Sequence, residues 1–296
     1  MRVLVTGGCG FIGSALLRAL QGHEVVNLDA LTYAGRRENA EGFEARFVHG
    51  DICDPSAVTS AMEGVEVVFH LAAESHVDRS NDDPAPFART NLVGTQVLCT
   101  AAIEAGVRRF VHVSTDEVYG SIDEGAFTES APLNPTNPYA ASKAGSDLLV
   151  LAAHKTHGLP ALITRCTNNF GPRQYPEKLI PLAITRLLAG EPVPVYGDGL
   201  QVRDWIHVED HARALVFLAE NGQIGEVYNI GADNTRTNLD VVRELCDHLG
   251  GSWVRVPDRP AHDRRYALDC TKLRALGFTA PVRDLSSTVK WYSHRS

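Results

Sequence analysis

A tyrosine and a lysine stand four residues apart in the segment Asn137-Pro138-Tyr139-Ala140-Ala141-Ser142-Lys143. Asparagine followed by proline is typical of a helix start, so Tyr139 and Lys143 should share one face of a helix. An ammonium group beside a phenol favours the phenolate and should lower the pKa of the phenol towards neutrality. The pair is therefore a candidate base that takes a proton from a hydroxyl while a hydride leaves for a nicotinamide.

Three further polar residues follow a β-branched run at residues 109–114: Thr115, Asp116 and Glu117. Ligands of parallel sheets bind at the carboxyl ends of the strands, so these side chains are expected near a substrate. Spacing alone leaves an alternative open, because two adjacent acids could equally cap a helix or face solvent in a turn.

A glycine-rich turn follows the first apolar run and contains Gly7, Gly10 and Gly13. Between a strand and a helix, such glycines permit a tight turn, close approach of a pyrophosphate and close helix packing. Asp29 ends the next strand, where an acid binds a ribose 2′-hydroxyl and repels a 2′-phosphate. We therefore expect NAD rather than NADP, although Arg36 and Arg37 nearby would suit a phosphate. A glycine-rich turn without a ligand is the alternative.

The elements that must position these residues alternate between short β-branched runs and longer helical patterns. Strands are expected at 2–6, 24–28, 45–49, 65–71, 109–114 and 160–164, and helices at 11–20, 56–62, 86–105 and 138–154. This order predicts an α/β fold with a doubly wound parallel sheet of the Rossmann type. In it, Asp51 and Ile52 would contact an adenine, and residues 71–73 would bring small side chains beside the cofactor.

A smaller C-terminal region should begin near residue 167, where the pattern loosens and prolines become frequent. It should contain helices at 180–189, 209–220 and 239–249 and a strand at 226–230. We expect an NAD-binding domain at 1–166, rejoined by about 201–229, and a substrate-binding domain at 167–200 and 230–296.

The composition excludes several classes of protein. Of the 296 residues 44% are hydrophobic and 22% charged, as in ordinary globular proteins, and no apolar stretch approaches the length of a membrane span. The net charge is −8, without a run of five like charges, which argues against nucleic-acid binding. Six cysteines without a C-x-x-C pair indicate free thiols and a soluble, cytoplasmic protein. His207 and His211 are interpreted as ordinary helix-start residues, and we expect no metal.

Taken together, these motifs resemble the extended short-chain dehydrogenase/reductases, and among them the enzymes of nucleotide sugars. The triad at 115–117 makes the chain most similar to the dTDP-glucose 4,6-dehydratase family, since related epimerases usually carry small or neutral residues after the hydroxyl. The segments 165–172, 176–181, 203–208 and 258–266 also resemble that family. Ala261 stands where the family usually has glycine.

The resemblance implies NAD-dependent dehydration of dTDP-glucose to dTDP-4-keto-6-deoxy-glucose without net redox change. Oxidation at C4 acidifies the C5 proton, which Glu117 would remove. Asp116 would protonate the leaving C6 hydroxyl, because two adjacent carboxyl groups can have their pKa values pushed apart. Thr115 would hydrogen-bond the C4 oxygen and assist Tyr139, and the hydride would return to C6. Lys143 completes the implied catalytic set.

The same resemblance implies two sets of ligand contacts. The NAD contacts are Gly7, Gly10, Phe11, Ile12, Gly13, Asp29, Leu31, Thr32, Asp51, Ile52, Leu71, Ala72, Ala73, Ser75, Thr90, Tyr139, Lys143 and Asn169. The substrate contacts are Ser75, Thr115, Asn168, Lys178, Leu179, Pro194, Tyr196, Arg203, Asn238 and His262.

The residues themselves leave some of these assignments open. Arg203 suits a diphosphate, because a guanidinium matches phosphate oxygens, but it could instead pair with Asp204 or Asp198. Tyr196 could stack on a pyrimidine or simply pack in a loop. A second basic cluster near the phosphates, or else a solvated surface, could be formed by Arg255, Arg259, Arg264 and Arg265.

Similar enzymes form homodimers through the helices expected here at 86–105 and 138–154. The apolar run at 148–151 fits such a contact, although a buried core helix would also explain it. Two other functions compete. A nucleotide-sugar 4-epimerase or decarboxylase has no obvious use for Asp116 and Glu117, and a non-catalytic NAD-binding regulator would not need Tyr139 and Lys143.

Overall fold

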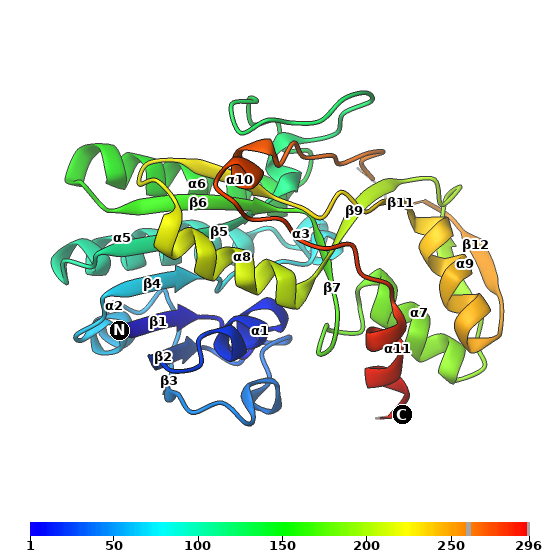
Figure 1. The fold of residues 1–296 in the computed structure, drawn as a ribbon, viewed down its shortest axis with the longest axis horizontal. Coiled ribbons are helices and arrows are strands. Elements are labelled where there is room, and N and C mark those ends of the chain that lie inside the picture. The colour runs from blue at the N-terminus through cyan, green and yellow to red at the C-terminus, as the bar shows by residue number, and fades with distance from the viewer. Residues whose placement is uncertain (259–261, 295–296) are drawn as a thin grey trace.

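A seven-stranded parallel sheet forms the centre of the computed structural model, which describes residues 1–258 and 262–294. The strand order is β10-β6-β5-β4-β1-β2-β3, with every neighbouring pair parallel (Figure 1). The strands are β1 (Arg2–Thr6), β2 (Glu24–Asp29), β3 (Arg46–His49), β4 (Val67–His70), β5 (Arg109–Thr115), β6 (Ala161–Cys166) and β10 (Val227–Ile230). The predicted α/β fold with a doubly wound parallel sheet is confirmed.

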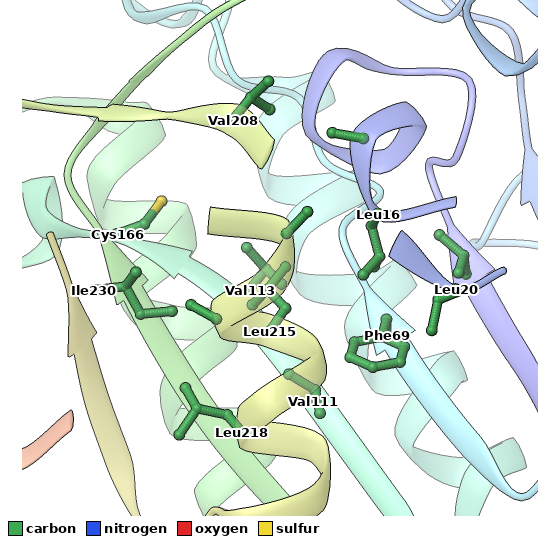
Figure 2. Packing of buried hydrophobic residues seen from close by; sticks show 14 of the residues in the cluster. Leu16, Leu20, Phe69, Val111, Val113, Cys166, Val208, Leu215, Leu218 and Ile230 are labelled. Atoms are coloured by element: carbon green, nitrogen blue, oxygen red, sulfur yellow. The ribbon is translucent and has the colours of Figure 1, made fainter. Parts of the chain in front are cut away.

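Side chains that alternate along each strand build one apolar layer on each face of the sheet. In β1, Val3 and Val5 enter one buried cluster and Leu4 enters the other. The first cluster is covered by α1 (Phe11–Ala19) and α8 (Val208–Asn221). Figure 2 shows Val111 and Val113 of β5 next to Leu215 of α8 in this layer. The second cluster is covered by α2 (Pro55–Met62), α5 (Thr95–Glu104) and α6 (Pro138–His157).

The predicted helices form, with one correction at 86–105. There the chain makes α4 (Ala85–Ala88), a π-helical stretch η2 (Arg89–Gly94) and then α5. Close packing accompanies this wider turn, because a Cβ on Gly94 would lie 2.5 Å from Ile52 Cδ1. The apolar spacing of 86–105 did not reveal the change in helical pitch.

Several short elements had no clear signal in the sequence. They are α3 (Val77–Asp82), η1 (Arg37–Ala40), η3 (Asp116–Tyr119), α10 (Thr271–Ala275) and α11 (Ser286–Ser293), with the strands β7 (Asn168–Phe170), β8 (Val193–Tyr196), β9 (Val202–His207), β11 (Thr235–Thr237) and β12 (Trp253–Val256).

These short strands belong to the smaller region beside the main sheet (Figure 1). β9 lies between β7 and β11, and β8 pairs with β12. The helices α7 (Leu179–Leu188), α9 (Asn238–Leu249) and α11 contribute to a separate apolar cluster. Among the described helices none is both long and apolar enough to cross a bilayer.

α6 is the helix that links the sheet to the polar residues of interest. The Asn137 side chain accepts a hydrogen bond from the Ala140 amide, Pro138 occupies the first turn, and Gly158 ends the helix with φ 72°. Asp147 on this helix is fully buried and pairs with Arg165 Nε of β6 at 2.9 Å. His112 Nε2 of β5 lies 3.3 Å from the same carboxylate, which lies between the helix and the two strands.

We predict that Asp147→Asn lowers the free energy of unfolding by about 3 kcal/mol, because removal of one partner leaves the Arg165 charge buried and uncompensated. Urea unfolding of the purified protein measures this change. Asp82→Asn, on an exposed position of α3, is the control and should change stability by less than about 0.5 kcal/mol. Equal unfolding midpoints for the two variants would contradict the role given to the buried pair.

Candidate active site

The carboxyl ends of the central strands open onto a cavity of about 330 Å³. Its walls come from the turns that follow β1, β2, β4, β5 and β6 and from the chain between β7 and α7. The cavity therefore joins the sheet to the smaller region. Thr115, Asp116, Glu117, Tyr139 and Lys143 all line it.

The glycine-rich turn forms a cradle at one end of this cleft. Gly7 has φ 75°, and a Cβ at this position would lie 2.9 Å from the backbone of Ala72. A Cβ on Gly13 would overlap the Gly7 carbonyl oxygen, so α1 packs directly against the turn. Gly10 precedes α1 without a capping side chain, which leaves the first amides of the helix facing the cleft. Such amides bind the phosphates of a dinucleotide.

Asp29 and its neighbours fit a ribose with free hydroxyls. The carboxylate accepts hydrogen bonds of 2.8 Å from the amides of Cys9 and Leu31, and burial raises its pKa. The two nearby arginines are stacked on rings, Arg36 on Tyr175 at 5.1 Å and Arg37 on Phe47 at 4.0 Å. This arrangement favours NAD over NADP at the site, since an acid rather than a base ends β2.

Thr115 connects the catalytic side chains at the end of β5. Its hydroxyl donates to Asp116 Oδ1 at 3.2 Å and accepts from the Glu117 amide at 3.3 Å. Thr115 also hydrogen-bonds Tyr139, which partly lowers the pKa of that phenol. The hydroxyl, the phenol and the two carboxyl groups thus meet in one place.

The two adjacent carboxyl groups occupy different environments. Asp116 is 3% exposed, and burial together with the charge of Glu117 raises its pKa to about 8. Glu117 is half-buried and accepts a hydrogen bond from the Asn137 side chain at 3.3 Å. Asp116 therefore holds a proton at neutral pH that it can donate.

The expected lowering of the Tyr139 pKa by Lys143 is wrong for the chain itself. Burial and the charge of Glu117 raise the pKa of Tyr139 well above its usual value. The Lys143 ammonium is directed to the Val113 carbonyl oxygen at 2.8 Å, and burial lowers its pKa to about 8. Burial of the phenol therefore has a larger effect on the Tyr139 pKa than the Lys143 ammonium, and no sequence pattern predicts that burial.

Most of the predicted ligand contacts line the cleft. Leu31 is the exception among the predicted cofactor contacts; its backbone has φ 52° and its amide binds Asp29. Of the predicted substrate contacts, the cleft walls contain Ser75, Thr115, Asn168 and Lys178. The cleft walls do not include Leu179, Pro194, Tyr196, Arg203, Asn238 or His262, which belong to the smaller region.

Arg203 lies close to the acid pair although it does not line the cavity. It is 4% exposed, stacks on the Tyr266 ring at 4.1 Å and donates to the Asp263 carbonyl oxygen, and its charge partly lowers the Asp116 pKa. Asp204 instead accepts from the amides of Ala232 and Asn234.

The structure shows the surroundings of other residues whose roles the sequence left open. Tyr196 is 41% exposed and lies edge-on to His262, with ring centroids 6.4 Å apart. Arg264 pairs with Asp198 at 2.8 Å, Arg265 donates to the Gly125 carbonyl oxygen, and Arg255 is exposed. Arg259 and Ala261 lie outside the described residues.

A bridge across the cleft was not predicted. Tyr33, after β2, donates to Glu177 Oε1 at 3.1 Å, and its ring meets Tyr175 edge-on at 5.5 Å. The Arg79 guanidinium lies over the Tyr33 ring, with its Cζ 3.9 Å from the ring centroid. Tyr33, Tyr175 and Glu177 all line the cavity, so they join its two walls. The only signal for this bridge in the sequence was the segment 176–181, which contains Glu177 but does not predict its contact with Tyr33.

Unsatisfied polar atoms in the walls fit a site built for a polar ligand. Among the described residues, five buried atoms of the cleft have no hydrogen-bond partner: Ser114 Oγ, Asp116 Oδ2, Thr167 Oγ1, Asn168 Oδ1 and Gln174 Oε1. Buried polar atoms are normally paired, so these atoms are available to a bound sugar or cofactor.

Comparison with known proteins agrees with this geometry. A dTDP-glucose 4,6-dehydratase of Streptomyces niveus is 51% identical, covering 99% of this chain and 93% of the relative. The low-salt glycan biosynthesis protein Agl12 of Haloferax volcanii is 53% identical over 94% of this chain and 93% of its own. The crystal structure of DesIV, a dTDP-glucose 4,6-dehydratase from Streptomyces venezuelae with NAD bound, matches with TM-score 0.96 and 50% identity, covering 99% of this chain and 97% of that one.

The family of the chain is shown by a match that covers most of its length. Residues 3–231 match the NAD dependent epimerase/dehydratase family, a span that contains the glycine cradle, the acid pair and the Tyr139–Lys143 helix. The chain therefore belongs to the NAD dependent epimerase/dehydratase family.

Proposed function

We propose that this chain catalyses the NAD-dependent dehydration of dTDP-glucose to dTDP-4-keto-6-deoxy-glucose. The observation that carries the proposal is the buried Asp116 beside Glu117, at hydrogen-bond distance from the Thr115 hydroxyl, where burial raises the Asp116 pKa to about 8. An epimerase moves only the C4 hydrogen and needs no second acid, so this pair distinguishes the two reactions. The names of the relatives from Streptomyces support the same activity.

The first step requires a base at the C4 hydroxyl. Tyr139 takes this proton, and Thr115 hydrogen-bonds the developing oxyanion. The positive charges of Lys143 and of bound NAD would offset the burial that raises the Tyr139 pKa. When bound, NAD would supply the hydride acceptor for C4 and, in its reduced form, the hydride donor for C6. Gly7, Gly10, Gly13 and Asp29 would hold it.

The elimination uses the two carboxyl groups in opposite roles. Glu117 removes the C5 proton, which the new C4 ketone has made acidic, and Asn137 orients the carboxylate through its hydrogen bond. Asp116 gives its proton to the C6 hydroxyl, which leaves as water. The proton held by Glu117 then returns to C5 and restores its carboxylate. The proton that Tyr139 took from the C4 hydroxyl restores Asp116, with Thr115 hydrogen-bonded to both groups, so all side chains are regenerated and no net redox change occurs.

We propose a division of labour between the two parts of the chain. Residues 1–166 with 201–229 would form the NAD-binding domain and residues 167–200 with 230–296 the substrate-binding domain. Ser75 and Arg203, the latter on β9 of the smaller region, would contact the nucleotide sugar although they fall within the first of these. Ser75, Asn168 and Lys178 would contact the sugar end from the cleft walls. Arg203, buried next to the acid pair, would face the diphosphate, and Leu179, Pro194, Tyr196, Asn238 and His262 would surround the base.

A cytoplasmic homodimer is the assembly that we propose. Leu148 on α6 is 57% exposed and Val93 on η2 is 52% exposed, whereas Val150 is fully buried. The apolar run at 148–151 therefore contributes both to the core and to an apolar surface over packed helices. Free thiols at all six cysteines suit a reducing compartment.

Incubation of the purified protein with NAD and dTDP-glucose tests the function. We expect a product that is lighter by one water, with no accumulation of NADH, measured by mass spectrometry and nicotinamide absorbance. A product of unchanged mass with inverted C4 configuration would identify an epimerase instead. Absence of any reaction would leave only an NAD-binding fold.

Substitution of the acid pair should separate oxidation from elimination. In Glu117→Gln and Asp116→Asn, we expect C4 oxidation to proceed and water loss to slow by about 10²–10⁴-fold, the usual contribution of general acid–base catalysis. Single-turnover mixing would then show nicotinamide reduction without dehydration. Glu124→Gln, at an exposed position, is the control and should turn over normally. Undiminished water loss in the double variant would remove these residues from the mechanism.

The elimination should depend on pH through Asp116. Since its pKa is raised to about 8, the group is protonated below that pH and loses its proton above it. We expect the rate of water loss in single turnovers to decline above about pH 8, roughly tenfold per unit. Lys143 titrates in the same range, so C4 oxidation in Asp116→Asn is measured separately to isolate its contribution. A rate of water loss that stays flat to about pH 10 in the folded protein would contradict a protonated Asp116.

A further inference from the structure

A buried carboxylate to which the proposed reaction gives no role lies behind the catalytic lysine. Asp147 follows Lys143 by about one turn of α6, so the two side chains share one face of the helix. Asp147 is 0% exposed and Lys143 is 4% exposed. Lys143 lines the cleft, whereas Asp147 does not. Asp147 can therefore affect the reaction only through the residues that it contacts.

Hydrogen bonds fix Lys143 between α6 and β5. Its ammonium donates to the Val113 carbonyl oxygen at 2.8 Å, and its own carbonyl oxygen accepts from the Ser146 hydroxyl at 2.8 Å. His112 precedes Val113 on β5. The Nε2 atom of His112 lies 3.0 Å from the Ser146 hydroxyl oxygen and 3.3 Å from Asp147 Oδ1. The helical turn that carries the lysine is thus held against the strand that receives its ammonium.

These contacts also assign the proton on His112. Because the Ser146 hydroxyl donates its hydrogen to the Lys143 carbonyl oxygen, the Ser146 oxygen can only accept from His112 Nε2. Burial and the charge of Lys143 lower the His112 pKa to about 4, so the ring is neutral. His112 therefore offers Asp147 an N–H group without adding a charge.

Asp147 supplies negative charge to Lys143. Burial lowers the Lys143 pKa, and two groups oppose this effect, Asp147 and Cys166. The Cys166 thiol is uncharged near neutral pH, because burial raises its pKa to about 12. Burial also acts to raise the Asp147 pKa, but His112, Arg165 and Lys143 together hold it below its usual value. Asp147 therefore remains ionised beside the ammonium.

The other titratable groups around the lysine are not anions. His70 on β4 is uncharged, because burial lowers its pKa well below the usual value. Tyr139 on α6 keeps its proton in the chain alone, because burial raises its pKa. Arg165 on β6 is a cation, with Nε 2.9 Å from Asp147 Oδ2. Of the groups named here, Asp147 alone carries a negative charge near neutral pH.

We propose that Asp147 is a positioning residue for the oxidation at C4, because its buried carboxylate keeps Lys143 in the ammonium form while α6 and β5 hold the lysine in place. This inference rests on the proposed function. A fully buried lysine without a counter-charge loses its proton at about pH 5–6. With Lys143 neutral, the phenolate of Tyr139 would lose a nearby positive charge that favours it.

NMR titration of the full chain, labelled with ¹³C at the lysine ε carbon, measures the charge of Lys143 directly. We expect a midpoint near pH 8 in the original chain. In Asp147→Asn the midpoint should fall by about one pH unit or more, the usual effect of removing a close opposite charge. Lys143→Met, which lacks the signal, assigns it. A midpoint at about pH 6 or below in the original chain would overturn the proposal without any variant.

Single-turnover oxidation of dTDP-glucose, followed by nicotinamide absorbance, connects this charge to the reaction. At about pH 6 Lys143 is protonated in both chains, so the rate in Asp147→Asn should be close to that of the original chain. At about pH 9 the variant retains roughly a tenth of the charged lysine, so its rate should be about tenfold lower. A purely structural defect would instead lower the rate equally at both pH values.

Arg165→Gln is the matched control, because it breaks the same buried pair but leaves the carboxylate in place. Its Lys143 midpoint should not fall, and its rate should keep the pH dependence of the original chain. Circular dichroism at each pH establishes that both variants are folded. An equal fall of the midpoint in the two variants would overturn the proposal.

The two proposals fail in different ways. Absence of C4 oxidation in the original chain would overturn the proposed function together with this role of Asp147. Oxidation in the original chain, with an unchanged Lys143 titration in Asp147→Asn, would overturn the role alone.

Discussion

The buried carboxylate of Asp147 is the interaction on which the site depends. It lies between α6 and the neighbouring strands β5 and β6, where Arg165 and His112 meet it without solvent. The same charge partly restores the pKa of Lys143, one helical turn earlier. Because Tyr139 lies another turn before Lys143, one helix aligned by one buried pair places the phenol and the ammonium at the carboxyl end of β5.

The chemistry then follows from two different surroundings for two neighbouring carboxyl groups. Asp116 is buried in the cleft wall and keeps its proton because a buried charge beside Glu117 is unfavourable. Glu117 faces the cleft and is held by Asn137, the residue that also caps α6. The helix that carries the phenol therefore begins at the residue that orients the second acid. This coupling explains how oxidation and elimination act on adjacent carbons of one sugar.

The features that could be predicted from the sequence are those that depend on residues close together in the chain. Alternation in β1, the glycines after it and the Asn137-Pro138 start of α6 each express a local rule, and together they predict the sheet and the catalytic set. Features that depend on distant packing were missed or wrong. The π-helical stretch accompanies the close packing of Gly94 against Ile52. The Tyr33–Glu177 hydrogen bond joins residues 144 positions apart in the sequence, and the pKa of Tyr139 depends on burial.

The bridge across the cleft, formed by Tyr33 and Glu177, lies in the part of the site where the cofactor must stay bound. A reaction that removes a hydride from one carbon and returns it to another requires the same cofactor to remain bound throughout. Tyr33, from the turn beyond Asp29, binds Glu177 on the opposite wall, and Arg79 and Tyr175 pack on its ring. These contacts join the NAD side of the cleft to the chain that leads into α7 and Lys178. The bridge therefore ties together the two walls between which the cofactor would remain bound.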